Sequence, residues 1–294
     1  MDAGQSGVRT RLGGDGLPEL PGVRTSLPVL PQLADAARLA LSGGDGLVAT
    51  GLAVGTTALR GTSTAAELLS LVSDLGVRRV ALAHDSVTSH LGALCGQRGA
   101  IVASGTGSVA FAIGASAVAR VDGWGNIIGD AGSGFWIGRA GIDAVLRAHD
   151  GRGEATALMP LVQAEFPDLE AAYLDIQNDP GYVRRVAAYA KTVADLAASD
   201  EVCAGIIDQA AAELARSAIV ALRRVGEDAA PTTLVSIQGK IFLNERLRGR
   251  FVSLISDAIP GARFTPPQGD GLDGASMLFD LPDDSPLRAR VSYA

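Results

Sequence analysis

Apolar residues alternate between helical and strand-like spacing through the first third of the chain. They recur at helical spacing over 31–41 and again over 64–75, whereas short continuous apolar runs predict buried strands over 47–54 and 79–83. Such alternation predicts an α/β fold with a largely parallel sheet. Ligands of open α/β sheets bind beyond the carboxyl ends of the strands, so the residues that follow each strand are the first candidates for a site.

Helical patterns dominate the second half of the chain. Helices are predicted over 133–149 and 153–165, a long alanine-rich pair over 181–225, and another helix over 244–259. A strand is predicted over 232–237, followed by a turn. These helices carry no evident chemistry of their own.

Asp85 directly follows the predicted strand over 79–83, in the sequence His84-Asp85-Ser86. A carboxylate at this edge of the sheet is placed as a catalytic carboxylate would be. The alternative is that Asp85 only caps the helix that starts near Val87, a position that Asp favours. The local sequence leaves both interpretations open.

A glycine-rich turn, Ser104 to Ser108, connects an apolar strand over 100–103 to another over 109–113. A hairpin tip of small residues offers unhindered backbone N–H groups and hydroxyls, which can hold a phosphate without a lysine. A tight hairpin without a ligand would have the same sequence. The pattern therefore favours a phosphate-binding turn without excluding the simpler structure.

Trp124 is flanked by Gly123 and Gly125, and Asp130 follows among further glycines. An indole flanked by glycines can lie against a sugar or a base, and a nearby carboxylate can accept hydrogen bonds from the hydroxyls of that ligand. A buried packing Trp and a turn Asp remain the alternative. At the start of the chain, the turn from Asp2 to Ser6 can bend around a phosphate while its carboxylate holds a metal, or it can be a flexible terminus.

Composition narrows the function class. A length of 294 residues suggests about two domains, and the net charge of −7 without long charged runs argues against a nucleic-acid or anionic-membrane surface. Cys95 and Cys203 have no metal-ligand spacing, the three histidines form no metal cluster, and no apolar run reaches the length of a membrane helix. We therefore expect a cytoplasmic protein that acts on small molecules.

Two nucleotide motifs can be compared with the chain. A lysine-bearing P-loop is absent. Residues 105–110 satisfy the loose dinucleotide pattern G-x-G-x-x-A, but they continue as a strand pattern, whereas the dinucleotide-binding turn must open a helix. A dinucleotide-dependent oxidoreductase is therefore disfavoured.

The run from Ala100 to Arg139, and above all Gly-Trp-Gly at 123–125 followed by GDAGSGFWIGR at 129–139, resembles the N-acetylglucosamine kinase branch of the BadF/BadG/BcrA/BcrD ATPase family. That family belongs to the sugar kinase, actin and heat-shock ATPase superfamily. The resemblance implies an α/β fold of two ribonuclease-H-like, actin-like ATPase domains with the active site in the interdomain cleft. The domains would be 1–98 and 99–294, the second with a helical insertion around 150–225.

The resemblance also implies an ATP-dependent sugar kinase, with ATP and Mg²⁺ as cofactors and the 6-hydroxyl of N-acetylglucosamine as the expected acceptor. No nucleic-acid or membrane partner is expected, and a homodimer is left open. Asp2 would hold the metal and Asp85 would be the catalytic base, also touching the sugar. The remaining positions that the resemblance assigns to phosphate and nucleotide binding are Gly4, Ser6, Gly105, Thr106, Gly107, Ser108 and Gly239. Those that it assigns to sugar binding are Gly123, Trp124, Gly125 and Asp130.

The sequence departs from the family pattern at three places. No hydrophobic strand precedes Asp2, so an inner strand of the first domain is expected to be missing, which would mean a misassigned start or an impaired kinase. Gln238 replaces one of the paired glycines of the adenosine turn, which leaves the nucleotide preference open. The asparagine of an early sugar-site loop is not evident, and Thr25 and Ser26 are the nearest polar residues.

Two alternatives stay in view. The family's other branch activates acyl-CoA dehydratases through an iron-sulfur cluster that bridges a dimer, but Cys95 and Cys203 are not placed near the glycine loops as cluster ligands would be. The second alternative is a sugar- or nucleotide-binding regulator without turnover. It would bind nucleotide without transferring phosphate.

Overall fold

The computed structural model describes residues 1–42 and 48–294, so Leu47, the first residue of the strand predicted over 47–54, lies outside the described residues. The described chain forms two compact units. The first unit comprises Met1–Gly99, Phe111–Val118 and Thr265–Ala294, and the second comprises Ala100–Ala110 and Ala119–Phe264.

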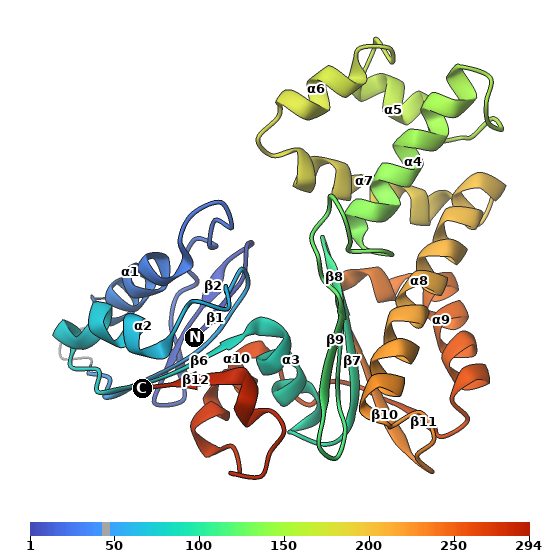
Figure 1. The fold of residues 1–294 in the computed structure, drawn as a ribbon. Helices are drawn as coiled ribbons and strands as arrows, with labels where there is room; N and C mark the ends of the chain where they lie inside the picture. Colours follow the sequence, from blue (N-terminus) through green and yellow to red (C-terminus); the bar gives the residue numbers. More distant parts are fainter. Residues whose placement is uncertain (43–47) are drawn as a thin grey trace. The chain divides into compact units, whose positions relative to one another are not determined.

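A five-stranded sheet forms the centre of the first unit, with the strand order β12-β6-β5-β1-β2. Helices α1 and α2 lie on one side of this sheet, and α3 and α10 pack against each other on the other side (Figure 1). Its strands and helices are β1 (Asp2–Ala3), β2 (Val8–Arg9), β3 (Arg11–Leu12), β4 (Asp15–Gly16), α1 (Val29–Ser42), β5 (Gly51–Thr56), α2 (Ala65–Val72), β6 (Arg79–His84), α3 (Asp85–Leu94), α10 (Gly271–Ser276) and β12 (Val291–Tyr293).

Strand β1 occupies an inner position of this sheet although it has only two residues. It pairs parallel to β5, with Asp2 opposite Gly55, and antiparallel to β2. The backbone N–H of Gly55 donates to Met1 O, at 3.0 Å. Where the sequence predicted that an inner strand would be missing, the structure therefore has a short strand that carries Asp2 itself.

The second unit is built on a sheet with the strand order β11-β10-β7-β8-β9. Helices α8 and α9 pack on each other, as do α4 and α7 (Figure 1). Its elements, apart from residues 99, 111–113, 118 and 265 at strand ends, which are counted with the first unit, are β7 (Gly99–Ser104), β8 (Ser108–Ile113), β9 (Val118–Asp122), α4 (Gly134–His149), α5 (Met159–Glu165), α6 (Ala172–Asn178), α7 (Tyr182–Leu196), α8 (Glu201–Val225), β10 (Thr233–Gln238), α9 (Glu245–Ala258) and β11 (Ala262–Thr265).

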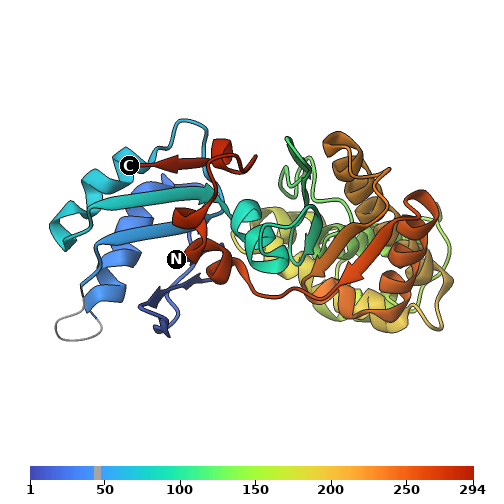
Figure 2. The ribbon, with the colours of Figure 1, turned by 90° about the horizontal axis from the view of Figure 1, so that it is seen from below.

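The division of the chain differs from the predicted domains at the C-terminus. Residues 265–294, which the prediction assigned to the second domain, belong to the first unit. Strand β12 pairs antiparallel to β6, and α10 packs against α3. Figure 2 shows this last segment, in red, returning to the strands of the first unit. The segment packs there because α10 and α3 cross closely at glycines. A Cβ on Gly274 would lie 1.8 Å from Thr88 O, and one on Gly92 would lie 1.8 Å from Asp270 O.

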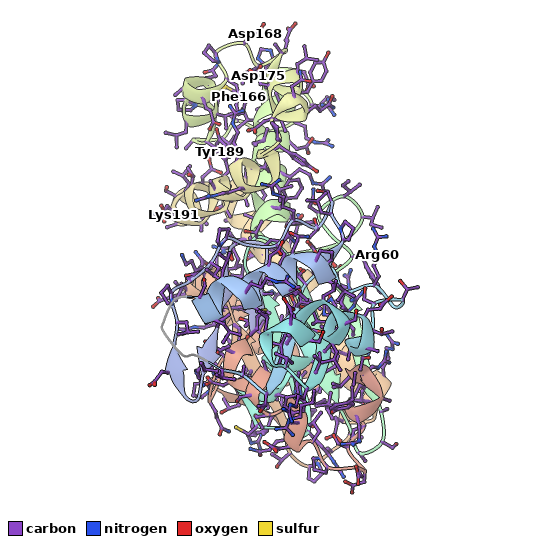
Figure 3. The ribbon with its side chains drawn as sticks, turned by 90° about the vertical axis from the view of Figure 1, so that its left-hand side faces the viewer. Arg60, Phe166, Asp168, Asp175, Tyr189 and Lys191 are labelled. Atoms are coloured by element: carbon purple, nitrogen blue, oxygen red, sulfur yellow. The ribbon has the colours of Figure 1, made fainter. Side chains whose placement is uncertain are left out.

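Helices α5 to α8 lie in the region around 150–225 where a helical insertion is predicted, and α4 directly precedes it. Helix α5 begins later than the helix predicted over 153–165, because Pro160 stands in its first turn, where proline is favoured. In Figure 3, Phe166, Asp168 and Asp175 lie together at the end of this region, and Tyr189 and Lys191 lie closer to the rest of the unit. No described helix is long and apolar enough to cross a membrane.

Candidate functional site

The hairpin tip between β7 and β8 is fastened to the beginning of α4. Gly105 O accepts a hydrogen bond from the N–H of Gly134, at 2.7 Å, and Thr106 O accepts one from Phe135, at 3.1 Å. These two N–H groups belong to the first turn of α4, where backbone donors lack partners within the helix. The hairpin is therefore held in place from behind while Gly105 and Thr106 remain exposed.

The serines of the hairpin use their hydroxyls within the protein. Ser104 Oγ donates to Gly132 O, at 3.3 Å, and Ser108 Oγ donates to Ala131 O, at 3.0 Å. These bonds join the hairpin to the loop that precedes α4. Of the tip residues, Thr106 is exposed, whereas Ser108 is buried and its hydroxyl is already hydrogen-bonded within the protein.

The loop from Asp122 to Ser133 is organised by the carboxylate of Asp122. Its two oxygens accept hydrogen bonds from the N–H groups of Asp130 and Ala131, each at 2.8 Å. Asp130 in turn accepts a hydrogen bond from the N–H of Gly125, at 3.1 Å. Gly125 has a positive φ of 87°, a conformation that glycine adopts without strain.

Asp130 lies directly against the hairpin. A Cβ on Gly107 would be 2.6 Å from Asp130 Oδ2, so only glycine leaves room for the carboxylate at this place. Burial raises the pKa of the Asp130 carboxyl, and the nearby Asp122 adds to this, whereas N–H donors from Gly125 and Ser108 act in the opposite direction. The structure thus brings the predicted phosphate-binding turn and the predicted sugar loop together.

Trp124 belongs to the same loop and is 57% exposed, so it is not the buried packing residue of the alternative interpretation. The guanidinium carbon of Arg120 lies 4.5 Å from the centre of the indole ring, within the range of a cation–π contact. An exposed, supported indole is suited to contact with the apolar face of a sugar.

Gly239 also lies at the start of the hairpin. A Cβ at this position would be 2.0 Å from Ser104 O, and φ is 101°. Glycine is therefore required both by the close backbone contact and by the left-handed conformation. The preceding Gln238 has a buried Nε2 that finds no hydrogen-bond acceptor among the described residues. The predicted adenosine turn therefore contacts the predicted phosphate-binding turn within the second unit.

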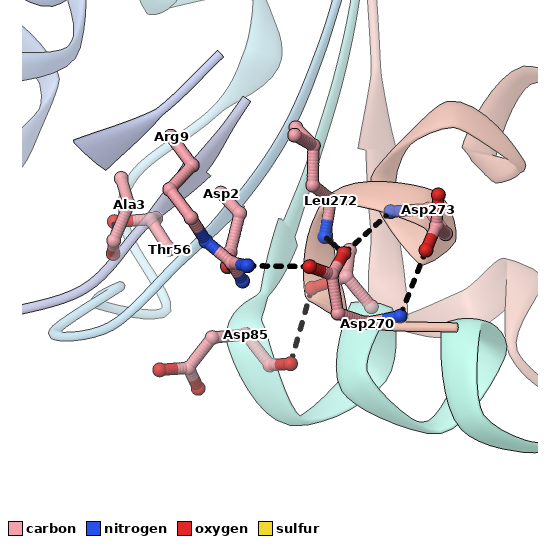
Figure 4. A network of polar contacts seen from close by, with 9 residues as sticks. Asp2, Ala3, Arg9, Thr56, Asp85, Asp270, Leu272 and Asp273 are labelled. Atoms are coloured by element: carbon pink, nitrogen blue, oxygen red, sulfur yellow. Dashed lines mark hydrogen bonds and ion pairs between the residues drawn. The ribbon is translucent and has the colours of Figure 1, made fainter. Parts of the chain in front are cut away.

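A cluster of charged residues surrounds Asp2 in the first unit (Figure 4). The Arg9 guanidinium contacts the carboxylates of both Asp2 and Asp270. Asp270 also caps α10, accepting hydrogen bonds from the N–H groups of Leu272 and Asp273 at 2.9 and 3.1 Å. Burial raises the pKa of the Asp2 carboxyl, although Arg9 acts in the opposite direction. Asp2 is thus a desolvated carboxylate that benefits from a cation.

The turn after Asp2 is closed by backbone hydrogen bonds. The N–H of Gly4 donates to Gly7 O, at 3.0 Å, and Gly4 O accepts from Val23, at 2.9 Å. Ser6 is exposed at the tip. The turn is therefore an ordered hairpin between β1 and β2 rather than the flexible terminus of the alternative interpretation.

Asp85 is the first residue of α3, whereas the cap of this helix is His84, whose Nδ1 accepts from the N–H of Ser86 at 3.2 Å. The interpretation of Asp85 as the helix cap is therefore wrong. One carboxylate oxygen of Asp85 lies 2.8 Å from His84 Nδ1, and the side chain is about one-third exposed. The charge of Asp85 also acts to raise the pKa of Asp2, after the larger effect of burial.

Mg²⁺ typically takes one or two protein carboxylates together with phosphate oxygens and waters. Within residues 1–42 and 48–294, no group of three His, Cys, Asp or Glu side chains is arranged to hold a metal ion. Asp2 nevertheless fits a single-carboxylate site, since it is desolvated and already paired with a cation. The structure contains no cysteine cluster in its described part either, and Cys203 is buried.

Sequence reasoning missed Arg9, Asp270 and Asp122. For Asp270 a signal exists, because Asp270 and Asp273 form a capping box, a pattern of two polar residues three positions apart before an apolar run. Arg9 and Asp270 are 261 positions apart, and no local pattern connects them.

The arrangement of these elements defines the class of the protein. The chain aligns over 94% of its length with 96% of a protein from Chromobacterium violaceum that is assigned as an N-acetylglucosamine kinase, with a TM-score of 0.70 and 25% identity. A second such kinase, from Porphyromonas gingivalis, has a TM-score of 0.67 at 17% identity, over 94% of this chain and 96% of that one. The fold is thus the two-domain α/β fold of actin-like ATPases and sugar kinases, as predicted.

The chain belongs to the BadF/BadG/BcrA/BcrD ATPase family, whose model matches residues 34–278. It is also 35% identical over 109 residues to an N-acetylmuramic acid/N-acetylglucosamine kinase of Clostridium acetobutylicum. That match covers 36% of each chain, so it spans about a third of the length of this relative. The predicted family is therefore confirmed.

Proposed function

We propose that this protein is an ATP-dependent sugar kinase that phosphorylates an amino sugar, with the 6-hydroxyl of N-acetylglucosamine as the acceptor. The observation that carries the proposal is the contact between Gly107 and Asp130, which joins the phosphate-binding hairpin to the loop of Trp124. A kinase needs its phosphate-binding and acceptor-binding groups close together, because phosphoryl transfer depends on positioning. The names of the relatives support the same activity.

The residues divide into three roles. Thr106 and the exposed backbone of Gly105 hold phosphate oxygens, with Gly107 and Ser108 shaping the turn and Gly239 holding the nucleotide beside it. Asp130 binds sugar hydroxyls. Trp124, held between Gly123 and Gly125, contacts the apolar face of the ring.

Asp85 is the base that orients the sugar hydroxyl and takes its proton. Asp2, with the turn through Gly4 and Ser6, holds the Mg²⁺ that accompanies ATP. Bound Mg-ATP supplies the phosphoryl group and neutralises charge on its oxygens. The protein supplies fixed donors and a desolvated carboxylate, and it needs no covalent chemistry of its own.

The position of transfer is tested by nuclear magnetic resonance on the product made from Mg-ATP and N-acetylglucosamine. We expect phosphorus coupling to the protons on C6. The matched control is 6-deoxy-N-acetylglucosamine, which should bind but form no product. Phosphorus coupling to the proton on C1, or product from the 6-deoxy sugar, would show that a different hydroxyl is used.

A further inference from the structure

Arg9 has a contact pattern that the kinase reaction does not require. Its two terminal nitrogens contact different carboxylates: Nη2 contacts that of Asp2, and Nη1 contacts that of Asp270 (Figure 4). Two residues further on, Arg11 pairs with Asp273 at 2.9 Å, while Asp273 belongs to the same helix start as Asp270. The two arginines thus join the consecutive strands β2 and β3 to the start of α10, but only Arg9 also contacts Asp2.

The position of this cluster is fixed by close backbone packing. A Cβ on Gly271 would lie 2.9 to 3.0 Å from the Asp2 carboxylate, so the start of α10 touches Asp2 directly. The crossing of α10 and α3 through Gly274 and Gly92 leaves little freedom for Asp270. Asp270 is held by its hydrogen bonds to the start of α10 and Asp2 by its burial, whereas Arg9 reaches both carboxylates with a long, half-exposed side chain that can change its rotamer.

The charges of the cluster do not balance. Asp2 and Asp270 carry two negative charges against the one positive charge of Arg9, and Asp85 adds a further negative charge that acts on Asp2. The Asp2 side chain is only 17% exposed, so water neutralises it poorly. The cluster therefore keeps an attraction for another cation while Arg9 occupies Asp2.

We propose that Arg9 is a built-in counter-ion that competes with the divalent cation for Asp2, and that the cation moves Arg9 onto Asp270. This inference rests on the proposed role of Asp2 in metal binding. Arg9 is a positioning residue in this account, since it acts through Asp2. Its removal should strengthen cation binding in the absence of nucleotide, which a merely structural tie between β2 and α10 would not do.

The test measures Mn²⁺ binding to the nucleotide-free protein by electron paramagnetic resonance of the free ion. Arg9→Gln should bind Mn²⁺ about tenfold more tightly than the unmodified protein, because the positive guanidinium that contacts the Asp2 carboxylate is lost. The matched control is Arg11→Gln, which removes the same charge and the neighbouring tie to α10. It should change the affinity by less than about twofold, since Arg11 does not contact Asp2.

Arg9→Lys covers the case in which Arg9→Gln does not fold, because it keeps a charge and a tie but lacks the two separate terminal nitrogens with which Arg9 reaches both carboxylates. We expect its affinity for Mn²⁺ to lie between that of the unmodified protein and that of Arg9→Gln. Equal or weaker Mn²⁺ binding by both Arg9 variants, or an equal gain in Arg11→Gln, would overturn the proposal. Failure of the kinase function is distinguishable, since it would appear as absent sugar-dependent turnover with the Mn²⁺ pattern intact.

Discussion

Asp85 lies at the carboxyl end of β6 and begins α3, where its carboxylate contacts His84 instead of a backbone N–H. The carboxylate is free of capping duties and about one-third exposed. A base that takes a proton from a sugar hydroxyl must be accessible to its substrate. The exposure of the Asp85 carboxylate meets this condition.

Asp85→Asn should reduce turnover by about 10² to 10⁴, the usual contribution of general base catalysis. The sugar KM should change little, because the amide keeps the shape of the side chain. Steady-state kinetics with N-acetylglucosamine would show this as a fall in kcat alone. Near-normal kcat in the variant would mean that another group accepts the proton.

The residues of the site differ in how far the sequence could predict them. Asp2, Asp85 and Asp130 lie next to strand ends or glycine turns, where local patterns indicate ligand binding. Arg9 could not be found in this way, and the capping box marks Asp270 only as a helix start, because the contact between the two joins positions 261 apart. Local sequence carries backbone geometry, whereas ion pairs between distant segments appear only once the chain is folded.

At the scale of elements, the hairpin between β7 and β8 depends on its neighbours. Its carbonyls bind the first turn of α4, and its serine hydroxyls bind the preceding loop. The sequence predicted both strands and the beginning of α4 near Ser133. It did not predict the hydrogen bonds between α4 and the hairpin, because the glycine pattern indicates only the backbone conformation of the turn.

Gly107→Ala should weaken sugar binding while leaving the protein folded. The new methyl group would meet Asp130 Oδ2 at 2.6 Å, and the end of that side chain can move away. We expect the sugar KM to rise by about tenfold, the cost of roughly one lost hydrogen bond to a charged group. The melting temperature should fall by only a few degrees.

Gly105→Ala is the matched control for this change. It adds the same methyl group two residues earlier, where no atom outside its chain neighbours lies within 4 Å. Its sugar KM should equal that of the unmodified protein. Equal effects of the two substitutions would contradict the role that we assign to the contact between Gly107 and Asp130.

At the scale of the whole molecule, the first unit is completed by the C-terminal segment, which packs against residues from the first third of the chain. Strand β12 pairs with β6, and α10 crosses α3 through glycine contacts. The sequence predicted the α/β class and the start of the second unit near residue 99. It assigned residues 265–294 to the second domain, whereas they belong to the first unit. Three residues of edge strand and a short helix carry too little pattern to indicate where they pack.

His90 makes the stability of the first unit sensitive to acid. It is fully buried in α3, where Nε2 contacts Gly99 O at 3.2 Å and Nδ1 has no partner among the described residues. Burial lowers the pKa of His90 to about 4. Because the unfolded value is 6.5, the neutral ring stabilises the fold above pH 6.5, and this contribution is lost as the pH falls toward 4.

The free energy of unfolding should therefore fall by about 3 kcal/mol from this residue between pH 6.5 and pH 4. Denaturant unfolding of His90→Gln should show a correspondingly flatter dependence on pH in that range. His149→Gln, which changes an exposed histidine, should keep the original dependence. Identical pH profiles for all three proteins would assign the acid sensitivity to other groups.

The central claim is that the chain transfers phosphate from ATP to an amino sugar, and ADP release tests it most directly. Purified protein with Mg-ATP is assayed against N-acetylglucosamine, glucosamine, N-acetylmuramic acid and glucose, and without sugar. We predict that ADP release depends on an N-acetylated amino sugar and exceeds the sugar-free rate at least about tenfold. ADP release that no sugar stimulates, from protein that binds ATP, would contradict the claim and indicate a nucleotide-binding protein without kinase activity.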